Sequence, residues 1–159
     1  MVDRNLTAVV GRWQITLRRA RLRDLPALLH LEKLCFDQDA WGSFGLLWAL
    51  LSPRNVNLLA EFRSRIVGLI VGEKSSWCKQ AIIANLAVHP GFRRRGLGGH
   101  LLKTCESITK WPGYYLTVRN SNAAAIALYE NSGYIRIGVR RYYYAGGEDP
   151  IEMQKTAKD

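Results

Sequence analysis

The chain has 159 residues and a mass of 18.0 kDa, enough for one domain with a sizeable core. No apolar run is long enough to cross a bilayer, and residues 1–5 lack a signal-peptide core, so we expect a cytoplasmic protein with no membrane segment. The three cysteines, Cys35, Cys78 and Cys105, stand at unrelated spacings, which argues against a disulfide scaffold or a cysteine-rich zinc site.

The formal net charge of +10 and the pI near 9.9 predict partners that are anionic, at least locally. The arginines lie in separate groups, at 18–23, 93–95 and 140–141, and form no continuous basic tail. We therefore expect no direct nucleic-acid function, since only the net charge supports one. The histidines have no metal-ligand spacing, and we predict no metal site.

The first part of the chain predicts a strand and two helices. Trp13–Leu17 alternates as a half-buried strand does. Asp24 is expected to cap a helix, and its apolar positions are Leu25, Leu28, Leu29, Leu31 and Leu34. Ser43 is expected to cap a second helix that stops near Pro53. We expect short polar tails at about 1–11 and 155–159.

The remainder of the chain predicts strands that alternate with two further helices. Extended runs occur at Val56–Phe62, Ile66–Gly72 and Ala81–Val88. Later elements are a helix from Leu97 to before Trp111, a strand at 114–118, a helix at 123–131, and closing strands at 135–144 and 151–154. This order predicts one mixed α/β sheet with helices on its faces.

Residues 93–99, with the sequence Arg-Arg-Arg-Gly-Leu-Gly-Gly, join an apolar strand to a helix. Backbone N–H groups at a helix start are unpaired and favour an anion. Gly96 and Gly98 permit turn geometry and close backbone approach, and arginine guanidinium groups suit phosphate oxygens. The segment predicts a pyrophosphate pocket, although it matches neither the dinucleotide fingerprint nor a P-loop. The alternative is a solvated basic helix start.

The sequence R-x-x-G-x-G at 93–98 is followed by Asn-Ala-Ala-Ala-Ile-Ala-Leu-Tyr-Glu-Asn-Ser-Gly-Tyr at 122–134. With segments 116–122, 140–144 and 148–149, these motifs resemble the GNAT N-acetyltransferases, most closely the RimI-type enzymes that act on ribosomal-protein alanine. The resemblance covers residues 15–153. It implies a single GNAT domain over 1–159, with a mixed, mostly antiparallel sheet, helices on both faces and a splayed central strand pair.

The resemblance also implies acetyl-CoA as the acetyl donor, without a metal. Its pantetheine arm would bind the backbone of Leu86, Ala87 and Val88, and its pyrophosphate would bind the segment Arg93, Arg94, Arg95, Gly96, Leu97, Gly98 and Gly99. Asn122 would bind the cofactor at the next helix start. Tyr129 would protonate the departing thiolate as a general acid. From its own pattern, Tyr129 could instead be a packed helix aromatic.

One position departs from the RimI-type pattern. The residue after Leu116 in L-x-V-R is a glutamate there, held to deprotonate the amine, and here it is Thr117, which has no titratable group. A water chain, another group, an amine that arrives neutral or a different substrate remain open. Acceptor contacts implied by the resemblance are Phe36, Trp41, Thr117, Tyr142, Tyr143 and Glu148, with Glu32 in the bordering region.

The leading function is therefore acetylation of a protein N-terminal α-amine, that of alanine in a small-subunit ribosomal protein. Lysine, a polyamine or another small amine is an alternative acceptor. A third hypothesis is an acyl-CoA-binding module without catalysis, for which Thr117 is the supporting feature. Nothing in the sequence predicts the oligomeric state.

Overall fold

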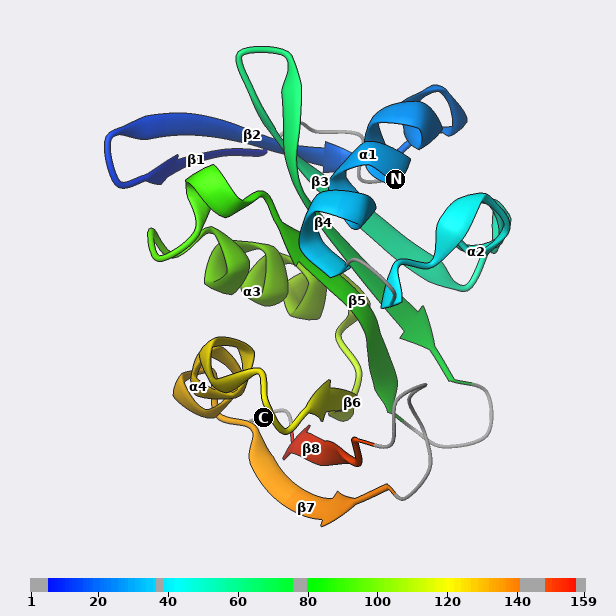
Figure 1. Cartoon of the computed structure of the whole chain (residues 1–159), viewed down its shortest axis with the longest axis vertical. Coiled ribbons are helices and arrows are strands. Elements are labelled where there is room, and N and C mark those ends of the chain that lie inside the picture. The colour runs from blue at the N-terminus through cyan, green and yellow to red at the C-terminus, as the bar shows by residue number, and fades with distance from the viewer. Residues whose placement is uncertain (1–5, 37–38, 76–79, 141–147, 157–159) are drawn as a thin grey trace.

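The computed structural model describes residues 6–36, 39–75, 80–140 and 148–156. These residues form an eight-stranded sheet with the order β1-β2-β3-β4-β5-β6-β8-β7 (Figure 1). Neighbouring strands run antiparallel, except that β5 and β6 run parallel. The strands are β1 (Leu6–Val10), β2 (Trp13–Arg19), β3 (Asn55–Phe62), β4 (Arg65–Lys74), β5 (Ala81–Val88), β6 (Gly113–Arg119), β7 (Ile135–Val139) and β8 (Pro150–Thr156).

Different helices cover the two faces of the sheet. The helices α1 (Leu25–Phe36) and α2 (Gly42–Leu51) bury Leu28 and Leu46 in a cluster with Ala87 of β5. The helices α3 (Leu97–Thr109) and α4 (Ala123–Asn131) bury Leu101 and Ile126 in the larger cluster on the other face. The predicted α/β sheet with helices on both faces is confirmed.

The helix α3 lies close against the centre of the sheet. Its Leu97, Leu101, Leu102 and Cys105 are buried at helical spacing, which explains why this amphipathic segment folds onto the strands. A Cβ at Gly72 of β4 would lie 2.6 Å from the Cys105 sulfur, so glycine there allows the close approach. The packing fixes where α3 begins relative to the end of β5.

An ion-pair cluster joins β2, β3 and the short 3₁₀ helix at Leu22–Asp24. Arg18 donates to both carboxylate oxygens of Asp24, at 2.8 and 2.9 Å, and to Glu61 at 2.9 Å. The hydrogen bond from Arg18 holds the pKa of the Asp24 carboxyl below its usual range. The carboxylate also accepts from the Arg21 N–H, so Asp24 belongs to the 3₁₀ helix and its side chain bonds back to the start of that helix. The prediction that Asp24 caps α1 is therefore wrong.

The two predicted tails are too long. Residues 6–10 form β1, which turns through Gly11, with φ +61°, and pairs with β2. At the other end, β8 extends to Thr156, since it pairs along its length with β6. The predicted Ser43 cap is also wrong, because Trp41 occupies the N-cap of α2 and makes no side-chain cap. The strand predicted at 135–144 ends at Val139, with 141–144 outside the described residues.

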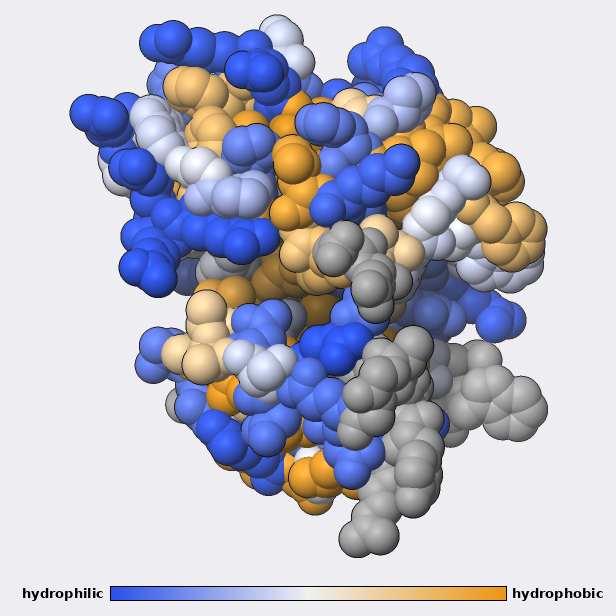
Figure 2. Space-filling view, in the orientation of Figure 1, coloured by the Kyte–Doolittle hydropathy of each residue, from blue (hydrophilic) through white to orange (hydrophobic). Residues whose placement is uncertain are grey.

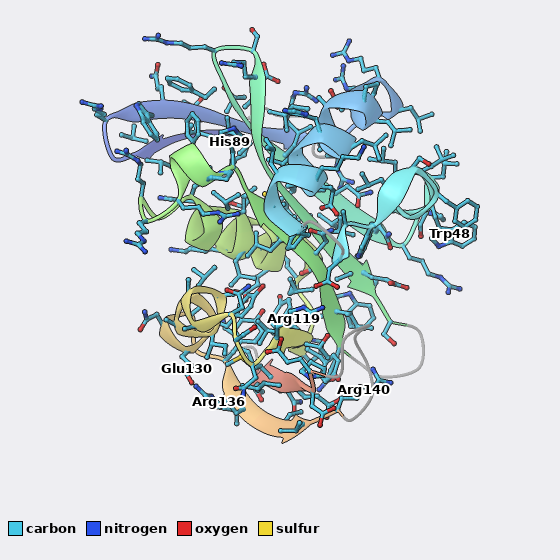
Figure 3. All side chains as sticks on the ribbon, viewed as in Figure 1. Trp48, His89, Arg119, Glu130, Arg136 and Arg140 are labelled. Carbon is cyan, nitrogen blue, oxygen red and sulfur yellow. The ribbon has the colours of Figure 1, made fainter. Side chains whose placement is uncertain are left out.

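Exposed apolar side chains gather on α2, where Figure 2 shows a hydrophobic surface at one side of the molecule. Phe44 is 80% exposed and Trp48 is 68% exposed, and Figure 3 shows Trp48 pointing outward. This helix begins and ends within ten residues, and no described helix is long and apolar enough to cross a membrane.

Candidate active site

The two central strands separate along their length. β5 pairs with β6 only at Ala81 with Tyr114 and at Ile82 with Tyr115, after which the ribbons diverge (Figure 1). On its other edge β5 carries a bulge against β4, where Ala84 is the additional residue. The splayed strand pair expected from the family resemblance is confirmed, and it leaves backbone groups of both strands available in the gap.

A cavity of about 150 Å³ lies at this gap. It brings together six residues that the sequence singled out, from the α1–α2 region, β5, β6 and α4. The full lining is Phe36, Asp39, Trp41, Ile83, Ala84, Asn85, Leu86, Thr117, Val118, Arg119, Asn122, Ala125 and Tyr129. Segments far apart in the chain thus form one site, with the sheet opening at its centre.

Tyr129 reaches the cavity from α4 and is only 8% exposed. Its ring packs at 5.7 Å from the ring of Tyr134, at an angle of 59°. The Tyr134 hydroxyl donates to Glu106 of α3 at 2.8 Å, which fixes that ring against the core. Tyr129 is therefore both a packed aromatic and a wall of the cavity, so the two sequence interpretations do not exclude each other.

The three arginines before α3 have different environments. Arg93 donates its Nε to the backbone oxygen of Val88 at 2.9 Å, which joins the loop to the end of β5. The guanidinium of Arg95 lies 4.1 Å from the centre of the Trp13 ring, a cation–π contact. Arg94 is exposed, and within the described part of the chain its side chain has no hydrogen bond or ion pair. It is the arginine best placed for an external anion.

The helix start that follows has the predicted geometry for an anion. Gly96 is the N-cap of α3 with φ +86°, a conformation that favours glycine, and no side chain caps the helix. His100 makes the first bond back to the Gly96 oxygen, so the N–H groups of Leu97, Gly98 and Gly99 precede the helical ladder. The Leu97 side chain is buried, and only its backbone is available.

Gly98 has a packing role that the sequence did not indicate. A Cβ there would lie 3.1 Å from Leu128 of α4, so glycine allows the first turn of α3 to contact α4. On the strand, Ala87 faces the α1–α2 side and is buried, and Leu86 lines the cavity. Val88 contributes its oxygen to Arg93 and to the Cys35 thiol. Thus of these three strand residues, only Leu86 meets the cavity.

The side chain of Asn122 caps α4, since its Oδ1 accepts from the Ala125 N–H at 3.1 Å. Tyr142 and Tyr143 lie outside the described residues. Glu148 accepts from Arg119 at 3.1 Å and from the Ser121 hydroxyl at 3.0 Å, and it lines a separate larger cavity of about 540 Å³. The hydrogen bonds that Glu148 accepts from the backbone N–H and the hydroxyl of Ser121 lower the pKa of its carboxyl.

Arg119 and Asp39 are site residues that the sequence analysis missed. The Arg119 guanidinium forms a two-point contact with the Asp39 carboxylate, at 2.5 and 2.7 Å, and Figure 3 shows Arg119 near the centre of the molecule. The contact joins the end of β6 to the α1–α2 connection. A signal was present, because Arg119 continues the alternation of Tyr115 and Thr117 and so shares their face of the sheet.

A buried carboxylate, that of Glu32, holds two residues that line the cavity, Asn85 and Trp41. Glu32 of α1 is 0% exposed and accepts from Asn85 Nδ2 at 2.8 Å and from the Trp41 N–H at 3.1 Å. Asn85 follows the β5 bulge and lines the cavity. Burial raises the pKa of the Glu32 carboxyl, and the two hydrogen bonds oppose that shift. Glu32 thus positions a cavity residue and the α2 N-terminus together.

Replacing Glu32 with glutamine should alter how stability depends on pH. Because its pKa is raised, the folded state holds this proton to a higher pH than the unfolded chain. The stability from this group is present below about pH 4.5 and is lost as the pH rises through the raised pKa. From pH 4.5 to 7, the difference in unfolding free energy between variant and wild type should therefore move in favour of the variant.

Chemical denaturation at several pH values measures this difference. The exposed Glu73 of β4 offers a matched control, since Glu73→Gln makes the same chemical change at a solvent-exposed position. Stability curves of Glu32→Gln and wild type that run parallel from pH 4.5 to 7 would contradict the assignment.

In the described residues no group of three His, Cys, Asp or Glu side chains could hold a metal ion. The two charged groups that line the cavity, Asp39 and Arg119, pair with each other. The arrangement suits a reaction between an anionic, extended donor lying in the strand gap and an acceptor entering beside Phe36 and Trp41.

Comparison with known proteins agrees with this geometry. The acetyltransferase (GNAT) family profile matches residues 20–134. The [ribosomal protein bS18]-alanine N-acetyltransferase of Escherichia coli K12 is 44% identical over 144 residues, which cover 87% of this chain and 95% of that protein. The N-alpha-acetyltransferase RimI of Mycobacterium tuberculosis is 36% identical over 151 residues, covering 91% and 94%.

Solved structures show the same fold. The crystal structure of the ribosomal-protein-S18-alanine N-acetyltransferase from Escherichia coli has a TM-score of 0.81 at 30% identity, covering 89% of this chain and 93% of that chain. The PaiA N-acetyltransferase of Thermoplasma acidophilum, solved with coenzyme A, has a TM-score of 0.76 at 18% identity, covering 90% and 99%. The chain belongs to the GNAT family of acetyltransferases.

Proposed function

We propose that this protein transfers the acetyl group of acetyl-CoA to the N-terminal α-amine of a protein, that of alanine in ribosomal protein bS18. The proposal rests on the opening between β5 and β6, which Tyr129 and Leu86 border. The relative in Escherichia coli, named for that alanine, supports the acceptor at 44% identity. The chain would act as one catalytic domain in the cytoplasm.

The site supports a division of roles among its residues. The backbone of residues 86–88 would bind the pantetheine arm as an added strand, because β6 does not pair with β5 there, although the Val88 oxygen already accepts bonds from Arg93 and Cys35. Arg94 and the N–H groups that follow Gly96 would hold the pyrophosphate. Arg93 and Arg95 would shape that loop through Val88 and Trp13.

The acceptor would enter between the α1–α2 connection and β6. Phe36 and Trp41 offer apolar surface at the cavity for a small N-terminal side chain. Its amine nitrogen would attack the thioester carbonyl carbon, and the Tyr129 hydroxyl would protonate the sulfur as the carbon–sulfur bond breaks. Tyr142, Tyr143 and Glu148 would complete the acceptor contacts, with Glu148 held by Arg119.

Release of free thiol from acetyl-CoA tests the acceptor. We expect release with a peptide that begins with the alanine of bS18, and none with the same peptide carrying an acetylated N-terminus. The panel also contains a lysine peptide with a blocked N-terminus and a polyamine. Turnover with either of these alone, or tight acetyl-CoA binding without turnover on any acceptor, would overturn the proposed function.

A further inference from the structure

A carboxylate lies directly across the strand pair from Thr117. In the antiparallel pairing of β6 with β8, Thr117 is opposite Glu152. Residues opposite each other in such a pair have side chains on the same face, with Cβ atoms about 5 Å apart. Thr117 lines the cavity, so the register places the base of the Glu152 side chain beside that wall.

A hydrogen bond confirms which face Glu152 occupies. The hydroxyl of Tyr115, two residues before Thr117 and on the same face, donates to Glu152 Oε1. The second oxygen, Oε2, lies toward β7, where Gly138 is its register partner. A Cβ at Gly138 would lie 3.1 Å from Oε2, so glycine leaves space for this carboxylate.

Within the described residues Glu152 forms no salt bridge, although Arg140 follows its register partner Gly138 by two residues at the end of β7. On its face, Arg119 is engaged by Asp39 and Glu148. From β7, Arg136 is opposite Met153, hence on the other face, and it pairs with Glu130, as Figure 3 shows at the edge of the molecule.

The remaining charged neighbour on β8 also points away. Lys155 lies on the other face and pairs with Glu106 at 2.6 Å. In the described part of the chain, Glu152 thus meets the Tyr115 hydroxyl as its polar partner.

We propose that Glu152 is the general base that deprotonates the acceptor amine, a role that Thr117 cannot perform. This inference rests on the proposed function. The ammonium gives one proton to the Glu152 carboxylate, and the nitrogen lone pair then forms the bond to the thioester carbon. The carbon–sulfur electron pair leaves with sulfur, which takes the Tyr129 proton, and the tyrosinate regains a proton from the new amide nitrogen. Glu152 returns its proton to solvent.

Replacing Glu152 with glutamine keeps the size of the side chain and an acceptor for Tyr115, and removes the base. General bases contribute about a hundredfold or more, so we expect kcat/KM on the bS18 peptide to fall by roughly that factor near pH 7. The α-amine has a pKa near 8, and the loss should shrink above about pH 9, where the free amine is neutral. Glu73→Gln, at an exposed position of β4, is the matched control and should leave the pH–rate profile unchanged.

Exchanging the two opposite residues between β6 and β8 provides the second test. Thr117→Glu combined with Glu152→Thr moves the carboxylate across the pair and keeps it on the same face, so activity near pH 7 should recover relative to Glu152→Gln. Thr117→Glu alone puts two carboxylates opposite each other, which raises the pKa of one and should shift the profile to higher pH.

The outcomes separate the two proposals. A folded Glu152→Gln variant with the wild-type pH–rate profile overturns the role of Glu152 and leaves the acetyltransferase intact. An equal loss at all pH values, without recovery in the swapped variant, assigns Glu152 a structural role and also overturns the proposal. Wild-type protein that turns over no N-terminal peptide overturns the proposed function itself.

Discussion

Replacing Tyr129 with phenylalanine should lower kcat by about a hundredfold or more, while acetyl-CoA affinity stays near that of the wild type. The residue is buried against Tyr134 and lines the cavity, so the variant keeps the packing and loses the transferable proton. An unprotonated thiolate is a poorer leaving group, and the loss should therefore fall on the chemical step. Single-turnover rates, together with acetyl-CoA binding, measure the two quantities separately.

Tyr134→Phe is the matched control. It removes a hydroxyl from the neighbouring ring, whose partner is Glu106 of α3 and not the cavity. We expect this variant to lose some stability, because Glu106 loses a hydrogen bond, and to turn over at the wild-type rate once folded. If Tyr129→Phe also turned over at that rate, Tyr129 would be a packing residue and water would protonate the thiolate.

Replacing Arg94 with alanine and Gly96 with valine together should remove most of the stabilisation that acetyl-CoA gives. A ligand at one hundred times its dissociation constant adds about 2.7 kcal/mol to the unfolding free energy, and a hundredfold loss of affinity reduces this to about 0.4 kcal/mol. Arg94 supplies an exposed cation, and valine is strained at the φ of +86° that orients the helix start.

The comparison is made against each variant's own ligand-free stability, because the strain at residue 96 also destabilises the unliganded fold. Arg54→Ala removes an exposed arginine from the connection between α2 and β3, at the opposite end of β4 from Gly68 and Val88. That control should respond to acetyl-CoA as the wild type does. Equal stabilisation of the double variant and the wild type in a thermal titration would place the pyrophosphate elsewhere.

The main elements were predictable because they have strong local signals. The apolar spacing of α3, the glycine at 96 and the asparagine at 122 each specify their structure within a few residues. β1 was missed because its stability comes from pairing with β2, a contact that its own five residues do not encode. Ser43 was mistaken for a cap because a capping residue is recognised by type, whereas the helix here begins at Gly42 and its N-cap is Trp41.

The residues of the candidate site also fall into two groups, those with a local sequence signal and those without one. Tyr129, Asn122 and Thr117 belong to contiguous motifs and were found from them. Asp39 and Glu152 were not, because their importance lies in register and in contacts across the sheet: Asp39 meets Arg119 eighty residues away, and Glu152 is opposite Thr117 through the β6–β8 pairing. The pattern of a single sequence indicates helical or strand periodicity and capping residues, but it does not indicate which strands become neighbours in the sheet.

The separation of β5 from β6 also bears on aggregation. Unpaired strand edges ordinarily invite the strands of other chains. Here the edge groups of residues 83–88 and 116–119 face an interior gap, with α1 packed on one face of the sheet and α3 on the other. An extended ligand can enter that gap from its open end, whereas a second folded sheet cannot align its own edge there. The protein thus exposes strand edges to a small molecule and shields the same groups from intermolecular pairing.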